Sequence, residues 1–517
     1  MCGIVFFANK DSVPIRNTMS SNILKTEIRL NRENKIALTV VSLYAVITFV
    51  LCLHHEMWGD ELNVWMALKN YSFLEVFRYS SEEGNPIFFF LPLLPFVKIG
   101  FSAHFIQFFC WLCSVLAIFL LNFLSPFSLI TKILITFSAP MIYHYSVMAR
   151  CYSVLPPLMF ITALLYPVVC NAKKSRIISR NVAVILYACC IAAISCTHII
   201  AYIFAGGLAA LFIFKNILGK QERNRYDIAA AAIMVAGIVI VTAQTMYALA
   251  ASSFFEKIPI TPGRVWTVFA SFFSSMADGL GDRLFNYDRS GMILYQVLAP
   301  VIAVAFFVSA GLLYKCNKYF AGIIVGTLLF YLYVSVSRWG GSVPYRVYVF
   351  LLVLISLSWA EKGKCLSEGR SSEKRVMFKA LEYSTALIML LTIPTGIEIS
   401  REDWKKNFSS AGEVADFIKA NISPDDKSII LCKSVAIAYH LDDRTVYYDY
   451  GKPLITIPMS NAEIEYNISE LLSFYDNIYF VSHYSAVLDN SDFLKKIYTS
   501  SDPMLDEKTH IYKFIGR

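Results

Sequence analysis

Long apolar runs constrain the fold of this chain more than any other feature of its sequence. Eleven segments, without acidic or basic residues in their middles, approach the length that a helix needs to cross the roughly 30 Å apolar core of a bilayer. They lie near residues 36–53, 104–124, 127–144, 152–170, 182–197, 199–217, 228–249, 291–313, 319–336, 346–360 and 378–397. Over 517 positions 56% of the residues are hydrophobic, which excludes a soluble globule. The sequence therefore predicts an α-helical polytopic membrane protein with about eleven transmembrane helices.

Basic residues predict how the chain is oriented in the membrane. Residues 1–35 contain six lysines and arginines just before the first span. Such basic flanks stay on the cytoplasmic side. Basic clusters at residues 173–180, 215–225, 315–318 and 362–375 fall on the same side if the chain crosses eleven times. We therefore expect residues 1–35 to be a cytoplasmic N-terminal segment of a multi-pass plasma (inner) membrane protein.

Residues 54–102 form one long outer loop in this topology, within a transmembrane domain at residues 36–397. The loop begins with an amphipathic stretch at residues 62–77. Residues 86–97 are apolar, but a run of twelve residues with three prolines is too short to span, so we expect it in the membrane interface. A second outer loop is expected at residues 250–290.

The composition changes after the last predicted span. Residues 398–517 are polar and carry a net charge of −6, whereas the rest of the chain carries +14. One helix-like segment and four strand-like segments follow one another in this region, at residues 411–421, 428–432, 445–449, 478–481 and 510–514. This pattern predicts a small extracytoplasmic α/β domain. The split in charge follows membrane orientation and does not indicate nucleic-acid binding.

An acidic pair, Asp60 and Glu61, follows Trp58 soon after the first span, so it is expected on the outer face beside the lipid headgroups. Two carboxylates in such a place are often the solvated first turn of a helix, where they favour the positive end of the helix dipole. They also suit general-base chemistry on a membrane-bound substrate. Both interpretations are open from the residues alone.

Arginines and tyrosines gather at the outer ends of later spans. Tyr145, Arg150 and Tyr152 lie at one junction, where a guanidinium and two hydroxyl groups could hold a phosphate. Arg338 and Arg346 bracket a Gly-Gly turn at another junction. Each arginine could instead anchor a helix end by reaching the headgroup phosphates.

His198 follows Thr197 at the outer end of a span, where a histidine is more often a structural hydrogen-bonding group than a ligand. No HExxH, P-loop, GxSxG or paired CxxC motif occurs in the sequence. Zinc hydrolase, nucleotide-driven and serine hydrolase functions therefore have no support.

The order of the outer-face motifs is similar to that of a known family. After the acidic pair come Glu83-Gly84-Asn85-Pro86, then Tyr145-Ser146-x-x-Ala149-Arg150-x-Tyr152, Thr197-His198, and Arg346 at the start of a late span that ends at Trp359. This order resembles the polyprenyl-phosphate-dependent GT-C glycosyltransferases, the group of the protein O-mannosyltransferases and the aminoarabinose transferase of lipid A. Residues 408–418 also resemble the outer domains of uncharacterised bacterial members.

The resemblance implies a GT-C-like transmembrane domain that moves a sugar from a polyprenyl-phosphate donor to a glycan, lipid or protein acceptor on the outer face. Asp60 would be the general base, and Glu61 would orient Asp60 or hold a divalent cation, the one cofactor that the resemblance brings in. Arg150 and Arg346 would stabilise the departing phosphate, and the anomeric carbon would be inverted. The further candidate substrate-binding residues are Tyr145, Tyr152, His198 and Arg338.

Other functions are compatible with a polytopic chain. They are a lipid or glycan transporter or flippase, an envelope polysaccharide polymerase or ligase, and an assembly scaffold. Ion-coupled transporters usually carry charged residues in mid-membrane, whereas the charge of this chain gathers outside the predicted spans. This distribution favours the glycosyltransferase.

Overall fold

A computed structural model describes most of the chain. It covers residues 32–516 except for residues 83–85, 172–177, 220–223, 252–257, 279–288, 340–342, 370–373, 424–426, 433, 442–445, 448–470, 483–487, 490–491 and 505–507. Several sequence-based predictions fall partly or wholly outside the described residues. They are most of the segment at residues 1–35, the motif at residues 83–85, the Gly-Gly turn between Arg338 and Arg346, parts of the basic clusters at residues 173–180, 215–225 and 362–375, parts of the loop at residues 250–290, and most of the strand at residues 445–449.

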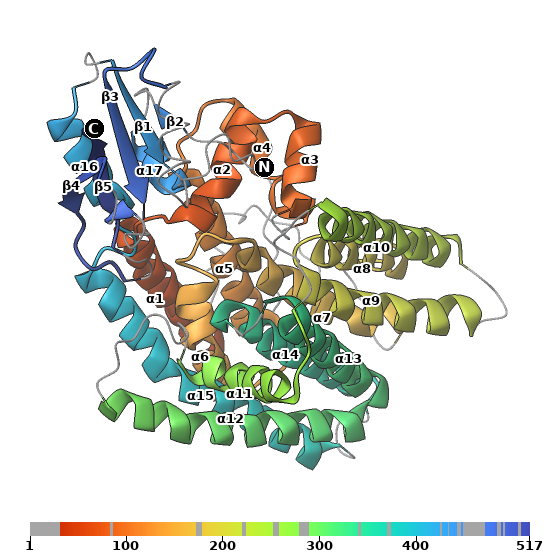
Figure 1. Ribbon diagram of the computed structural model, residues 1–517. Coiled ribbons are helices and arrows are strands. Elements are labelled where there is room, and N and C mark those ends of the chain that lie inside the picture. The colour runs from red at the N-terminus through yellow and green to blue at the C-terminus, as the bar shows by residue number, and fades with distance from the viewer. Residues whose placement is uncertain are drawn as a thin grey trace, which may run out of the picture.

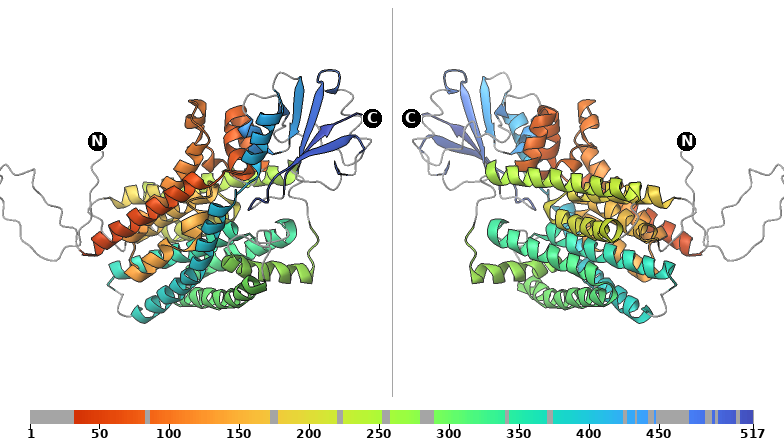
Figure 2. Two further views of the ribbon diagram at one scale, coloured as in Figure 1. Left: turned by 90° about the vertical axis from the view of Figure 1, so that its left-hand side faces the viewer. Right: turned by 90° about the vertical axis from the view of Figure 1, so that its right-hand side faces the viewer.

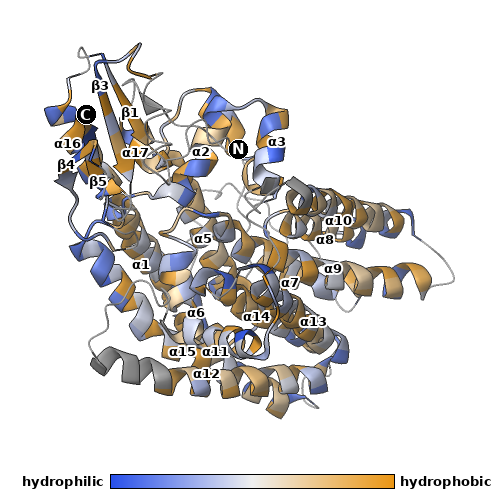
Figure 3. Cartoon of the chain, viewed as in Figure 1, coloured by the Kyte–Doolittle hydropathy of each residue, from blue (hydrophilic) through white to orange (hydrophobic). Residues whose placement is uncertain are grey.

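A body of mostly apolar helices makes up the larger part of the molecule (Figures 1 and 3). In chain order it contains α1 (Arg32–His54), α5 (His104–Leu124), α6 (Leu129–Thr136), η2 (Pro140–His144), η3 (Cys151–Val154), α7 (Leu155–Val169), α8 (Arg180–Ser195), α9 (Ile199–Ile213), η4 (Phe214–Leu218), α10 (Arg225–Ala251), α11 (Pro262–Asp278), α12 (Arg289–Cys316), α13 (Lys318–Val334), η6 (Ser335–Trp339), α14 (Pro344–Ser367) and α15 (Arg375–Lys405). Helix α14 passes through the interior, with an unbroken row of buried residues from Val347 to Glu361.

Among the described residues, eight helices are long and apolar enough to cross a membrane. Each of the eight coincides with a predicted span, and α5 has the predicted bounds. The other three predicted spans are the 16-residue helix α8, the 24-residue helix α14 and a broken segment at residues 127–144. The chain is therefore a multi-pass membrane protein, and the number of eleven crossings stays a prediction.

The segment at residues 127–144 is broken and leads into an irregular turn. Helix α6 ends at Thr136, and Pro140 opens the π turn η2. Proline lacks a backbone N–H and its ring clashes with the preceding turn, so a regular helix does not continue through it. The chain leaves helical geometry at residues 145–150, before η3 and α7 begin. This irregular turn carries Arg150.

The region predicted as a second outer loop, residues 250–290, contains a helix that the sequence analysis missed. In α11, Val268, Phe272 and Met276 are spaced by four residues and are completely buried. This spacing places them on one face of a helix, which packs against α12 and α14. The Tyr348 hydroxyl of α14 also donates a hydrogen bond to the Met276 carbonyl at 3.3 Å. The expectation of a loop was therefore wrong for the helical part of this region.

The segment at residues 54–102, which was predicted to be an outer loop, contains short helices: α2 (Gly59–Asn70), α3 (Phe73–Glu82), η1 (Ile87–Phe89) and α4 (Leu94–Lys98). Glu61, the third residue of α2, accepts a hydrogen bond from the Trp58 N–H at 3.0 Å, as glutamate often does at a helix start. The acidic pair thus lies in a first helical turn. Its two carboxylates, however, contact different partners.

The C-terminal region contains a five-stranded sheet with two helices. Its elements are α16 (Ala411–Asn421), β1 (Ser428–Cys432), α17 (Val435–His440), β2 (Val446–Tyr447), β3 (Asn477–Ser482), β4 (Leu494–Thr499) and β5 (His510–Phe514). The strand order is β2-β1-β3-β5-β4, with β1 parallel to both β2 and β3, and β5 antiparallel to β3 and β4. The predicted helix and the strands predicted at residues 428–432, 478–481 and 510–514 are confirmed, and the two described residues of the strand predicted at residues 445–449 form β2. The missed strand, β4, is an edge strand with two exposed lysines, which weaken the apolar pattern of a strand.

The sheet lies beside the segment that carries the acidic pair (Figures 1 and 2). Helix α17 packs on α2, and the Tyr439 hydroxyl of α17 accepts a hydrogen bond from the Ala103 N–H at 3.4 Å. The Gly412 N–H of α16 donates to the Glu56 carboxylate at 2.7 Å. The C-terminal region is therefore attached to the helical body at the end where α2 follows α1.

Cysteine labelling tests the predicted orientation of the chain. Cys432 is buried in β1, so it cannot report on solvent access. We expect Lys495→Cys, on the exposed edge strand β4, to react with an impermeant maleimide in spheroplasts. Arg375→Cys, exposed at the start of α15, should react only after lysis, and the wild-type protein gives the background. The reverse pattern would mean that the C-terminal region faces the cytoplasm.

Candidate active site

An ion pair joins two of the segments that the sequence analysis singled out. Arg150 Nη1 lies 2.9 Å from Asp60 Oδ2. The Arg150 side chain is only 10% exposed, whereas that of Asp60 is 39% exposed. Solvent and salt screen such a half-enclosed pair less than a surface pair. The structure therefore brings together the predicted base on α2 and the predicted phosphate ligand on the turn before η3.

Aromatic rings enclose the Arg150 guanidinium. The distances from its Cζ atom to the ring centroids are 4.7 Å for Tyr345, 5.6 Å for Trp58 and 5.8 Å for Tyr152. A cation within about 6 Å of a ring centroid is attracted to the ring face. These rings therefore hold the guanidinium in place from several elements of the fold.

Arg346 contacts the same tyrosine as Arg150. Its Cζ atom lies 5.8 Å from the Tyr345 ring centroid and 4.0 Å from that of Trp339. Within the described part of the chain, Arg346 forms no ion pair, and its Nε atom is buried without a hydrogen-bond partner. Buried polar atoms in native proteins are nearly always paired. An unpaired guanidinium N–H is able to donate a strong hydrogen bond to an anion.

His198 orients the hydroxyl of Tyr152. His198 is buried at the start of α9, where its Nδ1 atom accepts a hydrogen bond from the Ile200 N–H at 3.2 Å. Burial, and then the charges of Arg346 and Arg150, hold the pKa of His198 well below its usual range, so the ring is neutral. A neutral ring that accepts at Nδ1 carries its proton on Nε2. This proton is donated to the Tyr152 oxygen at 2.8 Å, which leaves the Tyr152 O–H free to donate elsewhere.

Glu61 is completely buried, and both of its oxygens are used within the protein. One oxygen accepts from the Ala149 N–H, and the other accepts from Trp58 at 3.0 Å and lies 3.2 Å from His55 Nε2. This geometry favours the orienting role over a metal-binding role. In the residues that the structure describes, no cluster of three or more His, Cys, Asp or Glu residues is arranged to hold a metal ion, and the divalent cation stays a prediction.

Tyr145 lies behind Tyr152 rather than beside the ion pair. Its ring centroid is 6.4 Å from that of Tyr152, and its hydroxyl donates to the Tyr345 carbonyl at 3.3 Å. Tyr145 therefore supports the two tyrosines that touch Arg150.

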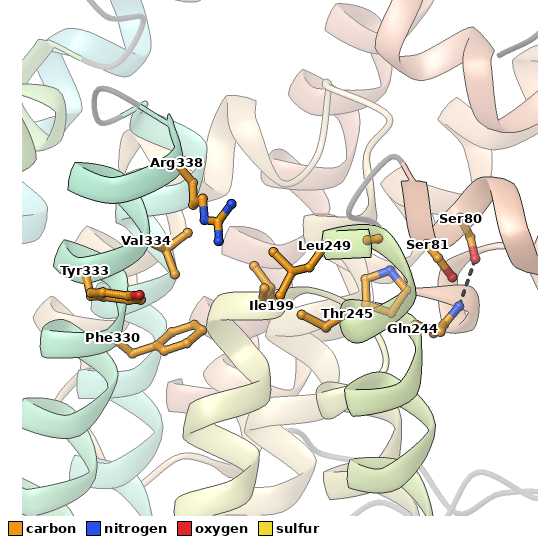
Figure 4. Close-up of a pocket in the computed structure, with 12 residues that line it drawn as sticks. Ser80, Ser81, Ile199, Gln244, Thr245, Leu249, Phe330, Tyr333, Val334 and Arg338 are labelled. Carbon is orange, nitrogen blue, oxygen red and sulfur yellow. Dashed lines mark hydrogen bonds between the residues drawn. The ribbon is translucent and has the colours of Figure 1, made fainter. Parts of the chain in front are cut away.

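Arg338 lies at a separate, mostly apolar pocket of about 160 Å³ between α3, α10 and α13. Figure 4 shows its side chain extending toward Ile199 and Leu249. The other lining residues include Ser80, Gln244, Phe330 and Tyr333. Two residues that line the pocket are chain neighbours of residues in the Arg150 site, because Ile199 follows His198 and Arg338 precedes Trp339.

Several site residues were not singled out from the sequence as ligands. Tyr345 lies within cation–π distance of both arginines, Trp339 of Arg346, and Trp58 of Arg150. A usable signal was present, because each aromatic residue stands next to an arginine or to the acidic pair in the sequence. Aromatic neighbours of a half-buried arginine commonly hold it by cation–π contact.

Comparison with known proteins gives structural neighbours. No family model matches the chain, and no curated protein matches its sequence. Among solved structures, ArnT from Cupriavidus metallidurans in the apo state has a TM-score of 0.51 at 10% identity, covering 94% of this chain and 99% of that chain. The same protein bound to undecaprenyl phosphate gives a TM-score of 0.47 at 10% identity, covering 93% and 98%. Arabinofuranosyltransferase AftD from Mycobacteria gives 0.41 at 12% identity, covering 94% of this chain and 40% of that chain.

The likeness to apo ArnT extends over nearly the whole of both chains. At this level of identity it establishes the fold and leaves the activity to be argued from the site. The chain has a GT-C-like membrane fold, as the sequence resemblance implied.

Proposed function

We propose that the protein is an integral-membrane glycosyltransferase that moves a sugar from a polyprenyl-phosphate donor to an acceptor hydroxyl on the outer face of the plasma (inner) membrane. The observation that carries the proposal is the pair Arg150 and Arg346. Both contact Tyr345, and one is paired with the candidate base while the other has a buried, unpaired N–H. Two such guanidinium groups suit the single phosphate of a lipid-linked sugar.

The donor phosphate would lie between the two arginines. Tyr152 supports this placement, because His198 occupies its oxygen and leaves its O–H proton available to a phosphate oxygen. As the bond between the sugar and the phosphate breaks, negative charge develops on the leaving phosphate. Fixed donors in a half-enclosed site stabilise that charge without having to reorganise.

Donor binding would release the base. Asp60 is the ion-pair partner of Arg150, and a donor phosphate would take its place. The freed Asp60 carboxylate then accepts the proton of the acceptor hydroxyl, whose oxygen attacks the anomeric carbon from the face opposite the phosphate. The new bond to the acceptor oxygen forms as the bond to the phosphate oxygen breaks, polyprenyl phosphate leaves, and the anomeric carbon is inverted. This coupling would keep the base inactive until a donor is bound.

The donor's lipid chain would follow the apolar pocket near Arg338. The pocket is lined mainly by apolar side chains, and one of them, Ile199, directly follows His198 in the chain. A polyprenyl chain is apolar, and its transfer from water to an apolar surface is favourable. An apolar surface near the phosphate position would therefore bind the lipid chain of the donor. The acceptor would approach from the side of the C-terminal region and is a glycan, a lipid or a protein.

Tyr152→Phe is expected to weaken the binding of polyprenyl phosphate by about tenfold to a hundredfold, because a hydrogen bond to a charged group contributes about 1.5–3 kcal/mol. Equilibrium binding of a fluorescent polyprenyl phosphate to the purified protein measures the effect. Tyr145→Phe removes the corresponding hydroxyl group, which already donates to the Tyr345 carbonyl. The loss of polyprenyl phosphate affinity should therefore be smaller in this variant. Equal losses in the two variants would contradict the role given to Tyr152.

The lipid that accumulates in cells without the protein tests the donor class. We expect a monosaccharide on polyprenyl phosphate to accumulate, and wild-type protein but not the Asp60→Asn variant to restore its normal level. Accumulation of a glycan on polyprenyl pyrophosphate instead would point to a polymerase or ligase and would contradict the proposal.

A further inference from the structure

A buried histidine bridges two carboxylates beneath the candidate active site. His55 Nε2 lies 3.2 Å from Glu61, and His55 Nδ1 lies 2.9 Å from Asp403 Oδ2. The Tyr143 hydroxyl donates to the same Asp403 oxygen at 2.9 Å. The side chains of His55 and Glu61 are fully buried and that of Asp403 is 3% exposed. Neither His55 nor Asp403 was predicted from the sequence to be a site residue.

The contacts define the protonation of His55. Each ring nitrogen faces a carboxylate oxygen, and an ionised carboxylate only accepts hydrogen bonds, so both nitrogens must donate. Burial alone would lower the pKa of His55, but the charges and hydrogen bonds of Glu61 and Asp403 outweigh it and raise the pKa to about 10. His55 is therefore an imidazolium at neutral pH.

One end of the bridge, Glu61, joins the two chain segments that carry the Arg150–Asp60 pair. Glu61 follows Asp60 in α2, and its other oxygen accepts from the N–H of Ala149, which precedes Arg150. Asp403 lies in the last turn of α15, the helix that leads to the C-terminal region. The Glu61–Ala149 contact thus holds the start of α2 against the irregular turn at residues 145–150. His55 contacts the other oxygen of Glu61 and fixes the position of its carboxylate.

We propose that His55 is a positioning residue that, together with Asp403, holds Glu61 against the Ala149 amide and so keeps Asp60 in register with Arg150. The inference rests on the proposed function of Asp60 and Arg150.

Stability alone is a poor account of this bridge. Burying three ionised groups costs much of what their attraction returns, and apolar replacements of buried ion clusters are often neutral or stabilising. A charged bridge does supply directional contacts, which apolar packing does not. Small displacements of reacting groups can cost about a hundredfold in rate, so directional contacts beside the ion pair bear directly on catalysis.

A double-mutant cycle tests the proposal. Asp403→Asn keeps the size of the side chain and an acceptor for Tyr143, but removes the charge that faces His55. We expect it to lower kcat/KM by about tenfold to a hundredfold in the wild-type background. In the Asp60→Asn background, where there is no base left to position, the further loss should be much smaller. An equal loss in both backgrounds would show that Asp403 acts through general structure, and would overturn the proposal.

The controls separate positioning from stability. Glu382 lies near the other end of α15 and forms an ion pair with Lys362 at 2.6 Å. Glu382→Gln removes this carboxylate from the same helix. It should lower Tm without lowering kcat/KM. If Asp403→Asn does not fold, Tyr143→Phe removes one hydrogen bond from Asp403 and should give a smaller loss with the same dependence on Asp60. If the wild-type protein transfers sugar and Asp60→Asn transfers much less, the proposed function is supported regardless of the result for Asp403→Asn. The proposed function and the positioning role can therefore fail separately.

Discussion

Asp60→Asn is expected to slow sugar transfer by about 10²–10⁴-fold, the range that general-base assistance contributes. The amide keeps the size of the carboxylate but cannot take the acceptor proton. It also no longer competes with the donor phosphate for Arg150, because the ion pair at 2.9 Å is lost. The affinity for polyprenyl phosphate should therefore be unchanged or tighter while turnover falls.

The measurement pairs transfer from a labelled polyprenyl-phosphate sugar with equilibrium binding of polyprenyl phosphate. Asp416→Asn, the same chemical change at an exposed position of α16, is the matched control and should transfer normally. Near-normal transfer by Asp60→Asn would remove the proposed base and leave the acidic pair as the first turn of α2.

Arg150→Ala should produce the other large effect. Loss of one preorganised donor to a developing charge typically costs about 10²–10³-fold in turnover, and Arg150 also contributes to binding of the ground-state phosphate. Turnover and polyprenyl phosphate affinity should both fall. Arg150→Lys keeps the charge but loses the planar fork that is held between aromatic rings, so it should also be impaired, with little change in expression.

Arg264→Lys makes the same exchange in α11, where the guanidinium donates to the Pro259 carbonyl at 3.0 Å, and is a matched control. It should leave donor affinity unchanged. Unaltered affinity and turnover in Arg150→Ala would mean that this arginine anchors the end of a span and binds no substrate.

Local structure was largely predictable from the sequence because it is set by local patterns. The apolar run of α5 and the alternating or short apolar runs of β1 and β5 gave their bounds. The errors have physical causes. Helix α11 was read as a loop because charged residues around it suggested exposure, whereas its buried face depends on contacts with α12 and α14. The span at residues 127–144 was read as continuous although Pro140 interrupts it.

The parts of the candidate site were predictable, but their arrangement was not. Asp60 and Arg150 were both singled out, yet residue types alone do not indicate that they form an ion pair across ninety positions. The contact between His55 and Asp403 joins residues 348 positions apart, and neither residue lies in a recognisable motif. Glu61 was predicted to orient Asp60 or to hold a divalent cation, and the contacts with Ala149 and His55 that favour the orienting role join residues that no sequence pattern connects.

Proteoliposomes that contain the purified protein, a labelled polyprenyl-phosphate sugar and an envelope glycan acceptor test the central claim most directly. The fate of the lipid distinguishes a transferase from a flippase, because only transfer cleaves the bond between the sugar and the phosphate. We expect free polyprenyl phosphate and glycosylated acceptor to appear in equal amounts with wild-type protein, and neither to appear at a comparable rate with Asp60→Asn. Movement of intact polyprenyl-phosphate sugar across the bilayer without cleavage, unaffected by Asp60→Asn, would contradict the account.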